Sequence, residues 1–184
     1  QINEKNIIVE KGVIQDASFI IAEPGKTDSG MGNRGQTAKT SRNRDGSWTK
    51  KGKKSYFGYK VHTKMQRGSK IVKELAVTTA RVSDNAIDLA KPDEVVYRDK
   101  GYTGTKTKAI GNGTMRRGNL TPHEKLRNKR IQKKRSQGEH PFGTIHRAMN
   151  GGETRLTKVY RVFVQQLFVF AAYNLFRLIS LTRG

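Results

Sequence analysis

The chain has 184 residues, 34% of them hydrophobic, and its 37 lysines and arginines against 15 acids give it a formal net charge of +22. This length allows one domain with a modest core, and this charge favours a polyanionic partner, nucleic acid above all, with a ribosomal-type structural protein or a basic membrane-surface binder as alternatives. The absence of cysteine excludes disulfides, thiolate zinc sites and a cysteine nucleophile.

The first predicted element is a central strand over residues 13–22 (VIQDASFIIA). Apolar residues dominate it, as expected of a strand that is covered on both faces. Asp16 stands in the middle of this strand, where an ionised carboxylate is costly unless it is paired or coordinated. Two interpretations follow: an ion pair with one of the many basic residues, or a ligand to Mg²⁺ or Mn²⁺, which prefer oxygen donors.

Residues 25–54 are predicted to be a basic, flexible insertion, because Gly, Ser, Thr, Asn and basic residues replace aliphatic ones there. Residues 56–65 and 71–79 then alternate well enough to predict two strands, joined by a hairpin loop over residues 66–70. These two strands are expected to form a meander beside the first.

A short helix is predicted from Ser83 or Asp84, either of which can cap it, to Ala90. Residues 94–98 (EVVYR) then predict a short buried strand. Asp99 follows at the carboxyl end of that strand, which is the edge where open α/β sheets place their chemistry. Taken alone, an aspartate before Lys-Gly-Tyr is also explained as a turn residue.

A capping box that begins at Thr121, with proline at the next position, predicts the start of a long helix. The apolar stripe of this helix leaves Glu139 at the edge of the packed face. Pro141 lacks the N–H group that a helix needs, and it therefore predicts a kink or restart next to Glu139. An exposed glutamate four residues after Arg135 is also explained as one half of an ion pair.

The last predicted helix covers about residues 158–181 and is expected to be a buried core helix. Polar residues interrupt its apolar stretch, so no membrane span is predicted; they are Gln165, Gln166, Asn174 and Arg177. The four histidines of the chain are too dispersed for zinc-ligand spacing, and none is assigned to a metal.

The predicted order is three strands, a helix, a strand and a helix, with acids on the first strand, after the fourth strand and on a later helix. This order is that of an α/β, ribonuclease-H-like fold, a mixed sheet flanked by helices. The sequence also resembles the DDE transposases of bacterial and archaeal insertion sequences, in the groups numbered four and five. The segments that carry the resemblance cover nearly the whole chain in order: GVIQDAS (12–18), DGSW (45–48) with the lysines of 50–54, YFGYKVH (56–62), TTA (78–80) with Asp84, VYRDKGY (96–102), and Arg135 through Glu139 to Gly143.

The resemblance implies that Asp16, Asp99 and Glu139 are the three DDE residues, and that they hold two Mg²⁺ or Mn²⁺ ions. Part of the family also carries a signature of tyrosine, two residues, arginine, three residues, glutamate, six residues and lysine. Arg135 and Glu139 match this signature, whereas Gln132 replaces its tyrosine and His146 replaces its lysine, with Arg147 beside it.

Nine of residues 116–135 are Lys or Arg and one is acidic, which predicts a face that tracks phosphates, although a solvated charge run is the alternative. The predicted DNA contacts are Lys60, His62, Lys100, Arg130, Lys134, Arg135, His146 and Arg147. His62 is equally interpreted as a core histidine, and Trp48 and Tyr56 either stack on bases or pack against other side chains.

We therefore expect residues 1–184 to be the catalytic core of a DNA transposase. The chain begins without methionine and enters a strand almost at once, so we expect a fragment that lacks an upstream DNA-binding region. The expected activity is cleavage at transposon ends and transfer of the 3′-hydroxyl into double-stranded target DNA, in a prokaryotic cytoplasm at the nucleoid, without a membrane, and with a homodimer possible on DNA. The alternatives are a ribonuclease-H-like nuclease without strand transfer and a decayed transposase that binds nucleic acid without cutting.

Overall fold

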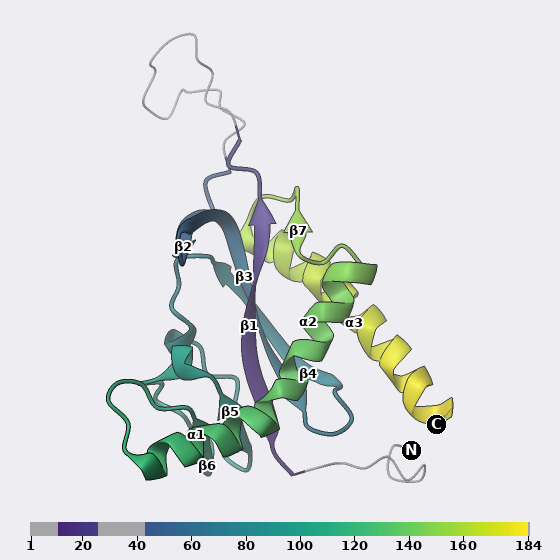
Figure 1. The fold of residues 1–184 in the computed structure, drawn as a ribbon. Coiled ribbons are helices and arrows are strands. Elements are labelled where there is room, and N and C mark those ends of the chain that lie inside the picture. The colour runs from purple at the N-terminus through teal and green to yellow at the C-terminus, as the bar shows by residue number, and fades with distance from the viewer. Residues whose placement is uncertain (1–10, 26–42, 184) are drawn as a thin grey trace.

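The computed structural model describes residues 11–25 and 43–183 (Figure 1). Its strands are β1 (Val13–Ala22), β2 (Ser47–Lys51), β3 (Lys54–Gln66), β4 (Val72–Thr79), β5 (Val95–Arg98), β6 (Gly111–Thr114) and β7 (Glu153–Thr154). Its α-helices are α1 (Pro122–Arg135), α2 (Glu139–Ala148) and α3 (Val159–Arg183), and its 3₁₀ turns are η2 (Asp84–Ala86), η3 (Lys100–Tyr102) and η4 (Ser136–Gly138). The strand predicted over residues 13–22 is confirmed with the same bounds.

Within the described ranges the strands form one seven-stranded mixed sheet, in which β2-β3-β1-β5-β6 is the main path. The central strand β1 runs antiparallel to β3 and parallel to β5, and β6 continues the parallel part. The predicted meander is confirmed, because β3 lies beside β1 and β4 pairs with β3. This arrangement places the middle of β1 and the carboxyl end of β5 next to each other.

A glycine makes the close pairing of β1 and β3 possible. Gly58 pairs with Ile21 and has a φ of +147°, and a Cβ atom added to it would lie only 2.1 Å from the carbonyl oxygen of Ile20. Any other residue at this position would push the two strands apart.

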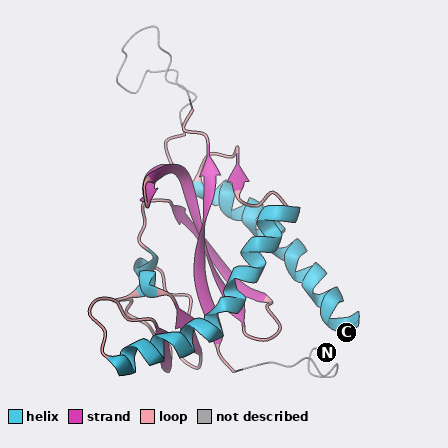
Figure 2. Ribbon diagram, viewed as in Figure 1, coloured by secondary structure: helices cyan, strands magenta, loops and turns pink. Residues whose placement is uncertain are grey.

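In Figure 2, α1 and α2 follow each other as one bent run of cyan helix across the magenta strands, and α3 is a separate long helix. α1 packs beside β5, α3 packs on β3 and β4, and α2 packs against α3. The main core lies where α2 and α3 meet the long strands, and it contains Ile14, Ile20, Tyr59, Val61, Met65, Ile145, Val162 and Phe170. β1 is therefore anchored by fully buried side chains on both sides of Asp16.

The predicted capping box and helix break are both confirmed. The Thr121 hydroxyl accepts from the Glu124 backbone, and the Glu124 carboxylate accepts from the Thr121 backbone, so α1 begins at Pro122. α1 ends at Arg135, and α2 begins at Glu139 after the single turn η4. Pro141 cannot donate to a carbonyl one turn back, which explains the tighter turn at that point.

The prediction that the last helix is a buried core helix is wrong for most of its length. One face of α3 is buried through Val162, Gln166, Phe170 and Tyr173, whereas Phe168 on the other face is 71% exposed. By length and composition α3 is the one helix of the described ranges that passes for a membrane span, with 22% of its apolar window buried. A single helix of this kind is weak evidence and does not indicate a membrane protein.

Two local predictions differ from the structure, and two short strands were not predicted. The insertion predicted over residues 25–54 contains β2, which pairs with β3, and its residues 26–42 lie outside the described ranges. The helix predicted from residue 83 to residue 90 is only the 3₁₀ turn η2. The short strands β6 and β7 carry no periodic pattern and form because β5 and β1 supply their partners.

Candidate active site

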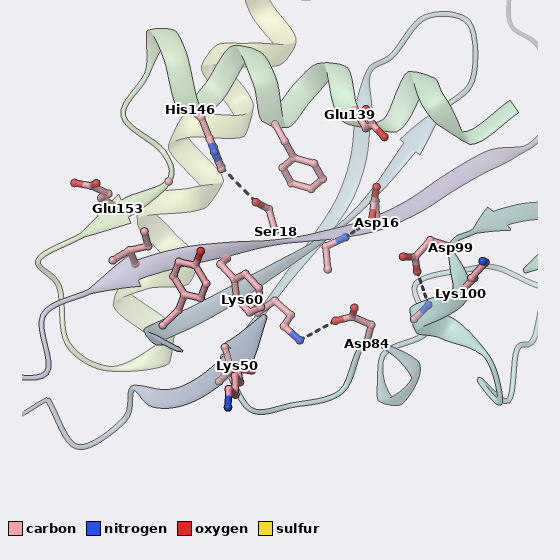
Figure 3. Close-up of a pocket in the computed structure, with 18 of the residues that line it drawn as sticks. Asp16, Ser18, Lys50, Lys60, Asp84, Asp99, Lys100, Glu139, His146 and Glu153 are labelled. Carbon is pink, nitrogen blue, oxygen red and sulfur yellow. Dashed lines mark hydrogen bonds and ion pairs between the residues drawn. The ribbon is translucent and has the colours of Figure 1, made fainter. Parts of the chain in front are cut away.

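A cleft of about 890 Å³ opens over the middle of β1 and the end of β5. Five carboxylates from different parts of the sequence line it: Asp16, Asp84, Asp99, Glu139 and Glu153 (Figure 3). Basic side chains line the same cleft, namely Lys50, Lys60, Lys100, Arg117, Arg135 and His146. The fold thus brings the three predicted acids into one cavity and adds two more, Asp84 and Glu153.

The Asp16 carboxylate is held in place at both of its oxygens, each of which accepts a hydrogen bond. Oδ1 accepts from the Ala17 backbone N–H at 2.9 Å, and Oδ2 accepts from Nη2 of Arg135 at 2.9 Å. Burial raises the pKa of Asp16, the Arg135 guanidinium opposes this rise, and the nearby Asp99 carboxylate adds to it. The predicted ion pair with a basic residue is present, and its partner is Arg135.

Asp99 lies beside Asp16 because of the strand register. β1 and β5 pair in parallel, with Val13 opposite Val96 and Ile14 opposite Tyr97, so the same register continued by two residues brings Asp16 next to Asp99. Asp99 also caps η3, and its Oδ1 accepts from the Gly101 backbone N–H at 2.8 Å. Asp99 is therefore both a turn residue and a residue of the cleft.

Glu139 reaches the cleft because η4 approaches β1 very closely. A Cβ atom added to Gly138 would lie 2.8 Å from Cγ2 of Ile14 and 3.8 Å from Oδ2 of Asp16, so glycine is the residue that allows this approach. Glu139 follows directly, with an exposed side chain on the first turn of α2. Figure 3 shows its carboxylate and that of Asp16 on the same side of β1.

Asp84 is one of the two acids of the cleft that the sequence did not assign to the site. Its Oδ1 accepts from Nζ of Lys60 at 2.8 Å, and Lys60 also donates to the carbonyl of Val82 at 2.8 Å. Asp84 belongs to one of the segments that carry the family resemblance, but its position after a serine favoured a helix cap. The family segment therefore did point to Asp84. Only its tertiary contacts with Lys60 and Gly101 distinguish a residue of the cleft from a helix cap.

The donor chemistry of the cleft fits a divalent cation such as Mg²⁺ or Mn²⁺. Asp16, Asp84, Asp99 and Glu139 offer hard oxygen donors, and no thiolate is present in the chain. Among the described residues, however, no three acidic or histidine side chains already lie close enough together to form a metal site. The carboxylates thus share one cleft, but a coordination sphere requires side-chain movement, such as release of Asp16 by Arg135.

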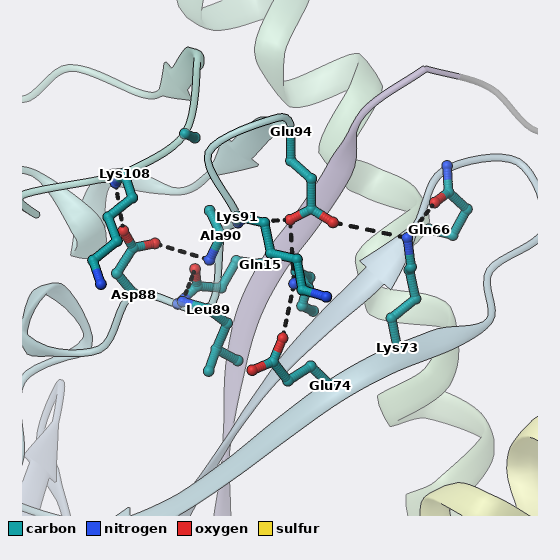
Figure 4. A network of polar contacts seen from close by, with 12 residues as sticks. Gln15, Gln66, Lys73, Glu74, Asp88, Leu89, Ala90, Lys91, Glu94 and Lys108 are labelled. Atoms are coloured by element: carbon teal, nitrogen blue, oxygen red, sulfur yellow. Dashed lines mark hydrogen bonds and ion pairs between the residues drawn. The ribbon is translucent and has the colours of Figure 1, made fainter.

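A buried polar network fixes the strands that carry Asp16 and Asp99. Arg98 is fully buried and donates to Oε1 of Gln15 through Nε at 3.0 Å and Nη2 at 2.7 Å, and it also pairs with Asp88. Asp88 is held in turn by the backbone N–H groups of Ala90 and Lys108 (Figure 4). Gln15 and Arg98 directly precede the two aspartates, so this network links their positions.

Two of the predicted DNA contacts lie inside the protein. His62 is fully buried and shares a 3.0 Å hydrogen bond with Oγ1 of Thr78, and burial lowers its pKa to about 4. Its alternative interpretation as a core histidine is the one that matches this position. Lys60 is 8% exposed and paired with Asp84, so it faces the cleft floor instead of the outer surface.

The other predicted contacts fall into two groups. Lys100, Arg135 and His146 line the cleft, and Nε2 of His146 lies 3.3 Å from Oγ of Ser18. The second group lies outside the described cleft lining and is exposed on the helices; it comprises Arg130, Lys134 and Arg147. Of the two aromatic candidates, Tyr56 lines the cleft and stacks on Phe19, whereas Trp48 packs edge-on against Phe57.

Comparison with known proteins gives a consistent answer. The transposase DDE domain family matches residues 10–175. The transposase for insertion sequence element IS1106 from Neisseria meningitidis serogroup B is 26% identical over 200 residues, which cover 96% of this chain and 69% of that protein. No solved structure matches. The match over nearly the whole chain, together with the mixed α/β sheet expected of a ribonuclease-H-like fold, shows that the chain belongs to the transposase DDE domain family.

Proposed function

We propose that this transposase domain cleaves DNA strands at transposon ends in a reaction that depends on a divalent metal, and then transfers the new 3′-hydroxyl into target DNA. The observation that supports this proposal most directly is the convergence of Asp16, Asp99 and Glu139, from a strand, a strand end and a helix start, on one cleft. The basic residues that line the same cleft provide the charge that a DNA phosphate requires.

Asp16, Asp99 and Glu139 are the residues that would hold two Mg²⁺ or Mn²⁺ ions. When bound, such ions activate an attacking oxygen and stabilise a leaving one during an in-line displacement at phosphorus. The protein itself contributes three ligands that are held in different ways. Asp16 is nearly buried and paired with Arg135, Asp99 accepts from the Gly101 backbone, and Glu139 is exposed on its helix.

Arg135 has a role in this scheme that follows from its contact with Asp16. Its guanidinium offsets part of the cost of burying the Asp16 carboxylate and so favours the ionised form, which is the form that binds a metal. Since Arg135 lines the cleft, it is also within reach of a phosphate there. We propose that Arg135 exchanges Asp16 for a DNA phosphate when the site is assembled.

The DNA path follows from the position of the remaining basic groups. Lys100 and His146 line the cleft on opposite sides of Asp16, and Arg130, Lys134 and Arg147 extend the basic surface along α1 and α2. We propose that double-stranded DNA lies across this surface in the cytoplasm, with its reacting phosphate over the carboxylates. A second copy of the chain on the same DNA would allow two transposon ends to be processed together.

The test is a strand-cleavage and strand-transfer assay with Mn²⁺ and a DNA duplex that carries the ends of the protein's own element. Asp16→Asn and Glu139→Gln should each lower the cleavage rate by more than about 100-fold, because losing a ligand should cost more than losing one of its supporting contacts. Asp93→Asn, which removes an exposed acid outside the described cleft lining, is the matched charge control.

Three outcomes would contradict the proposal in different ways. Cleavage at an unchanged rate by Asp16→Asn would show that Asp16 is not a metal ligand in this reaction. Cleavage by the unmodified chain without any joining of the 3′-hydroxyl to target DNA would indicate a nuclease. DNA binding without metal-dependent cleavage would indicate a decayed transposase.

A further inference from the structure

Tyr102 is a buried side chain with an unsatisfied hydroxyl group. It ends η3, three residues after Asp99, and is only 1% exposed. Its hydroxyl makes no hydrogen bond with any described residue. A buried hydroxyl without a partner is unfavourable, and native proteins rarely keep one without a functional reason.

The charges that act on this hydroxyl are those of three cleft carboxylates and of Arg98. Burial raises the pKa of Tyr102 strongly, and the negative charges of Asp16, Asp84 and Asp99 raise it further. The Arg98 guanidinium lies over the ring, 5.7 Å from its centroid. Tyr102 therefore remains a protonated, neutral hydrogen-bond donor next to groups that only accept.

The short turns η2 and η3 pack against each other, so Asp84 lies beside the segment that ends in Tyr102. A Cβ atom added to Gly101 would lie 3.0 Å from Oδ2 of Asp84 and 3.0 Å from Oδ1 of Asp99, so the backbone next to Tyr102 passes directly between these carboxylates. Oδ1 of Asp84 already accepts from Lys60, and Oδ1 of Asp99 already accepts from Gly101. The described residues donate no hydrogen bond to Oδ2 of either acid, so both of these oxygens are open to a further donor.

We propose that Tyr102 is a positioning residue of the metal centre, and that its hydroxyl donates to an open carboxylate oxygen of Asp84 or Asp99 when the cleft binds divalent cations. A neutral donor suits this task, because it orients a carboxylate without competing with the metal as Lys60 or Arg135 would. The role of Asp84 in this pair adds a fourth acid to the three that the family resemblance implies. This inference rests on the proposed function.

The test is Tyr102→Phe, which removes the hydroxyl and keeps the ring over Arg98. Calorimetric titration of the chain with Mn²⁺ should show binding weakened by about tenfold, the usual effect of losing one hydrogen bond to a charged group. The melting temperature without metal should not fall, because the hydroxyl has no partner to lose in that state. Tyr97→Phe is the matched control, since it also removes one tyrosine hydroxyl, but one that accepts from Lys134.

Unchanged Mn²⁺ binding by Tyr102→Phe would overturn the inference, and so would a lower melting temperature without metal, which would reveal a purely structural partner. If this variant does not fold, 3-fluorotyrosine placed at position 102 of the otherwise unchanged chain gives a second measurement. Its ¹⁹F resonance should shift when Mg²⁺ is added, and the absence of a shift would overturn the inference. Asp16→Asn distinguishes failure of this inference from failure of the proposed function, because full Mn²⁺ binding by that variant would contradict the proposed function itself.

Discussion

Arg135 and Asp16 form an ion pair between residues 119 positions apart, with Nη2 of Arg135 located 2.9 Å from Oδ2 of Asp16. Both side chains are nearly buried, with 10% and 15% of their surfaces exposed. The contact joins the break between α1 and α2 to the centre of the sheet. It places a cation of the protein on the carboxylate that we assign to the metal centre.

Arg135→Gln should destabilise the fold by about 3 kcal/mol at about pH 7, because it leaves a buried carboxylate without its cation. The raised pKa of Asp16 sets the pH dependence. Without Arg135 this pKa rises further, so the difference from the unmodified chain should shrink as pH falls and Asp16 binds a proton. Urea unfolding at about pH 7 and about pH 5 measures both effects.

Mn²⁺ should restore more stability to Arg135→Gln than to the unmodified chain, because it replaces the missing positive charge. Arg130→Gln, an exposed arginine of the same helix, should change neither quantity. Equal Mn²⁺ stabilisation of both Arg135→Gln and the unmodified chain would show that Arg135 and the metal do not share Asp16.

His62 should make the fold sensitive to mild acid. Its folded pKa of about 4 lies below its ordinary value of 6.5, so its contribution to stability is complete above pH 6.5 and is lost as pH falls towards 4. The loss should be about 1.4 kcal/mol per pH unit, up to about 3 kcal/mol. In urea unfolding, His62→Gln should lose this part of the pH dependence, whereas the exposed His123→Gln should retain it.

Gly138→Ala should disturb the site and the fold together. The added methyl group would lie 2.8 Å from Cγ2 of the fully buried Ile14, so η4 must move away from β1. We expect a loss of about 1–3 kcal/mol in stability and a lower cleavage rate, since both Arg135 and Glu139 flank this turn.

Gly143→Ala is the matched control within α2, where the nearest atom to an added Cβ is 3.9 Å away. It should stabilise the helix by about 0.5–1 kcal/mol and leave cleavage unchanged. If the two alanine variants behaved alike, the close approach of η4 to β1 would not be what positions the site.

Lys100→Gln should weaken DNA binding and reduce its salt dependence, because Lys100 is exposed at the cleft next to Asp99. The slope of log K against log salt should fall by about one for a lost phosphate contact. Fluorescence anisotropy over a salt series measures this slope. Lys73→Gln, a half-exposed lysine on β4 that pairs with Glu94, should leave the slope unchanged; an unaltered slope for Lys100→Gln would place the DNA elsewhere.

Local chemistry explains which parts of the fold could be predicted from the sequence. The apolar run of β1, the capping box at Thr121 and the missing N–H of Pro141 act through neighbouring residues, and all three were predicted correctly. β6 could not be predicted, because GNGT has no strand pattern of its own and pairs only because β5 lies beside it. The exposed face of α3 was also missed, since the periodicity of a helix does not show how much of its surface other elements cover.

The sequence by itself determined the family and the basic character of the chain, and it predicted the three acids Asp16, Asp99 and Glu139, because these depend on residue identity and order. Only the tertiary structure decided what surrounds those acids. Arg135 on Asp16, Asp84 on Lys60 and the Tyr102 hydroxyl beneath the cleft are contacts between distant segments. Neither periodicity nor charge count encodes such contacts, because burial and pairing depend on which segments the sheet and its helices bring together.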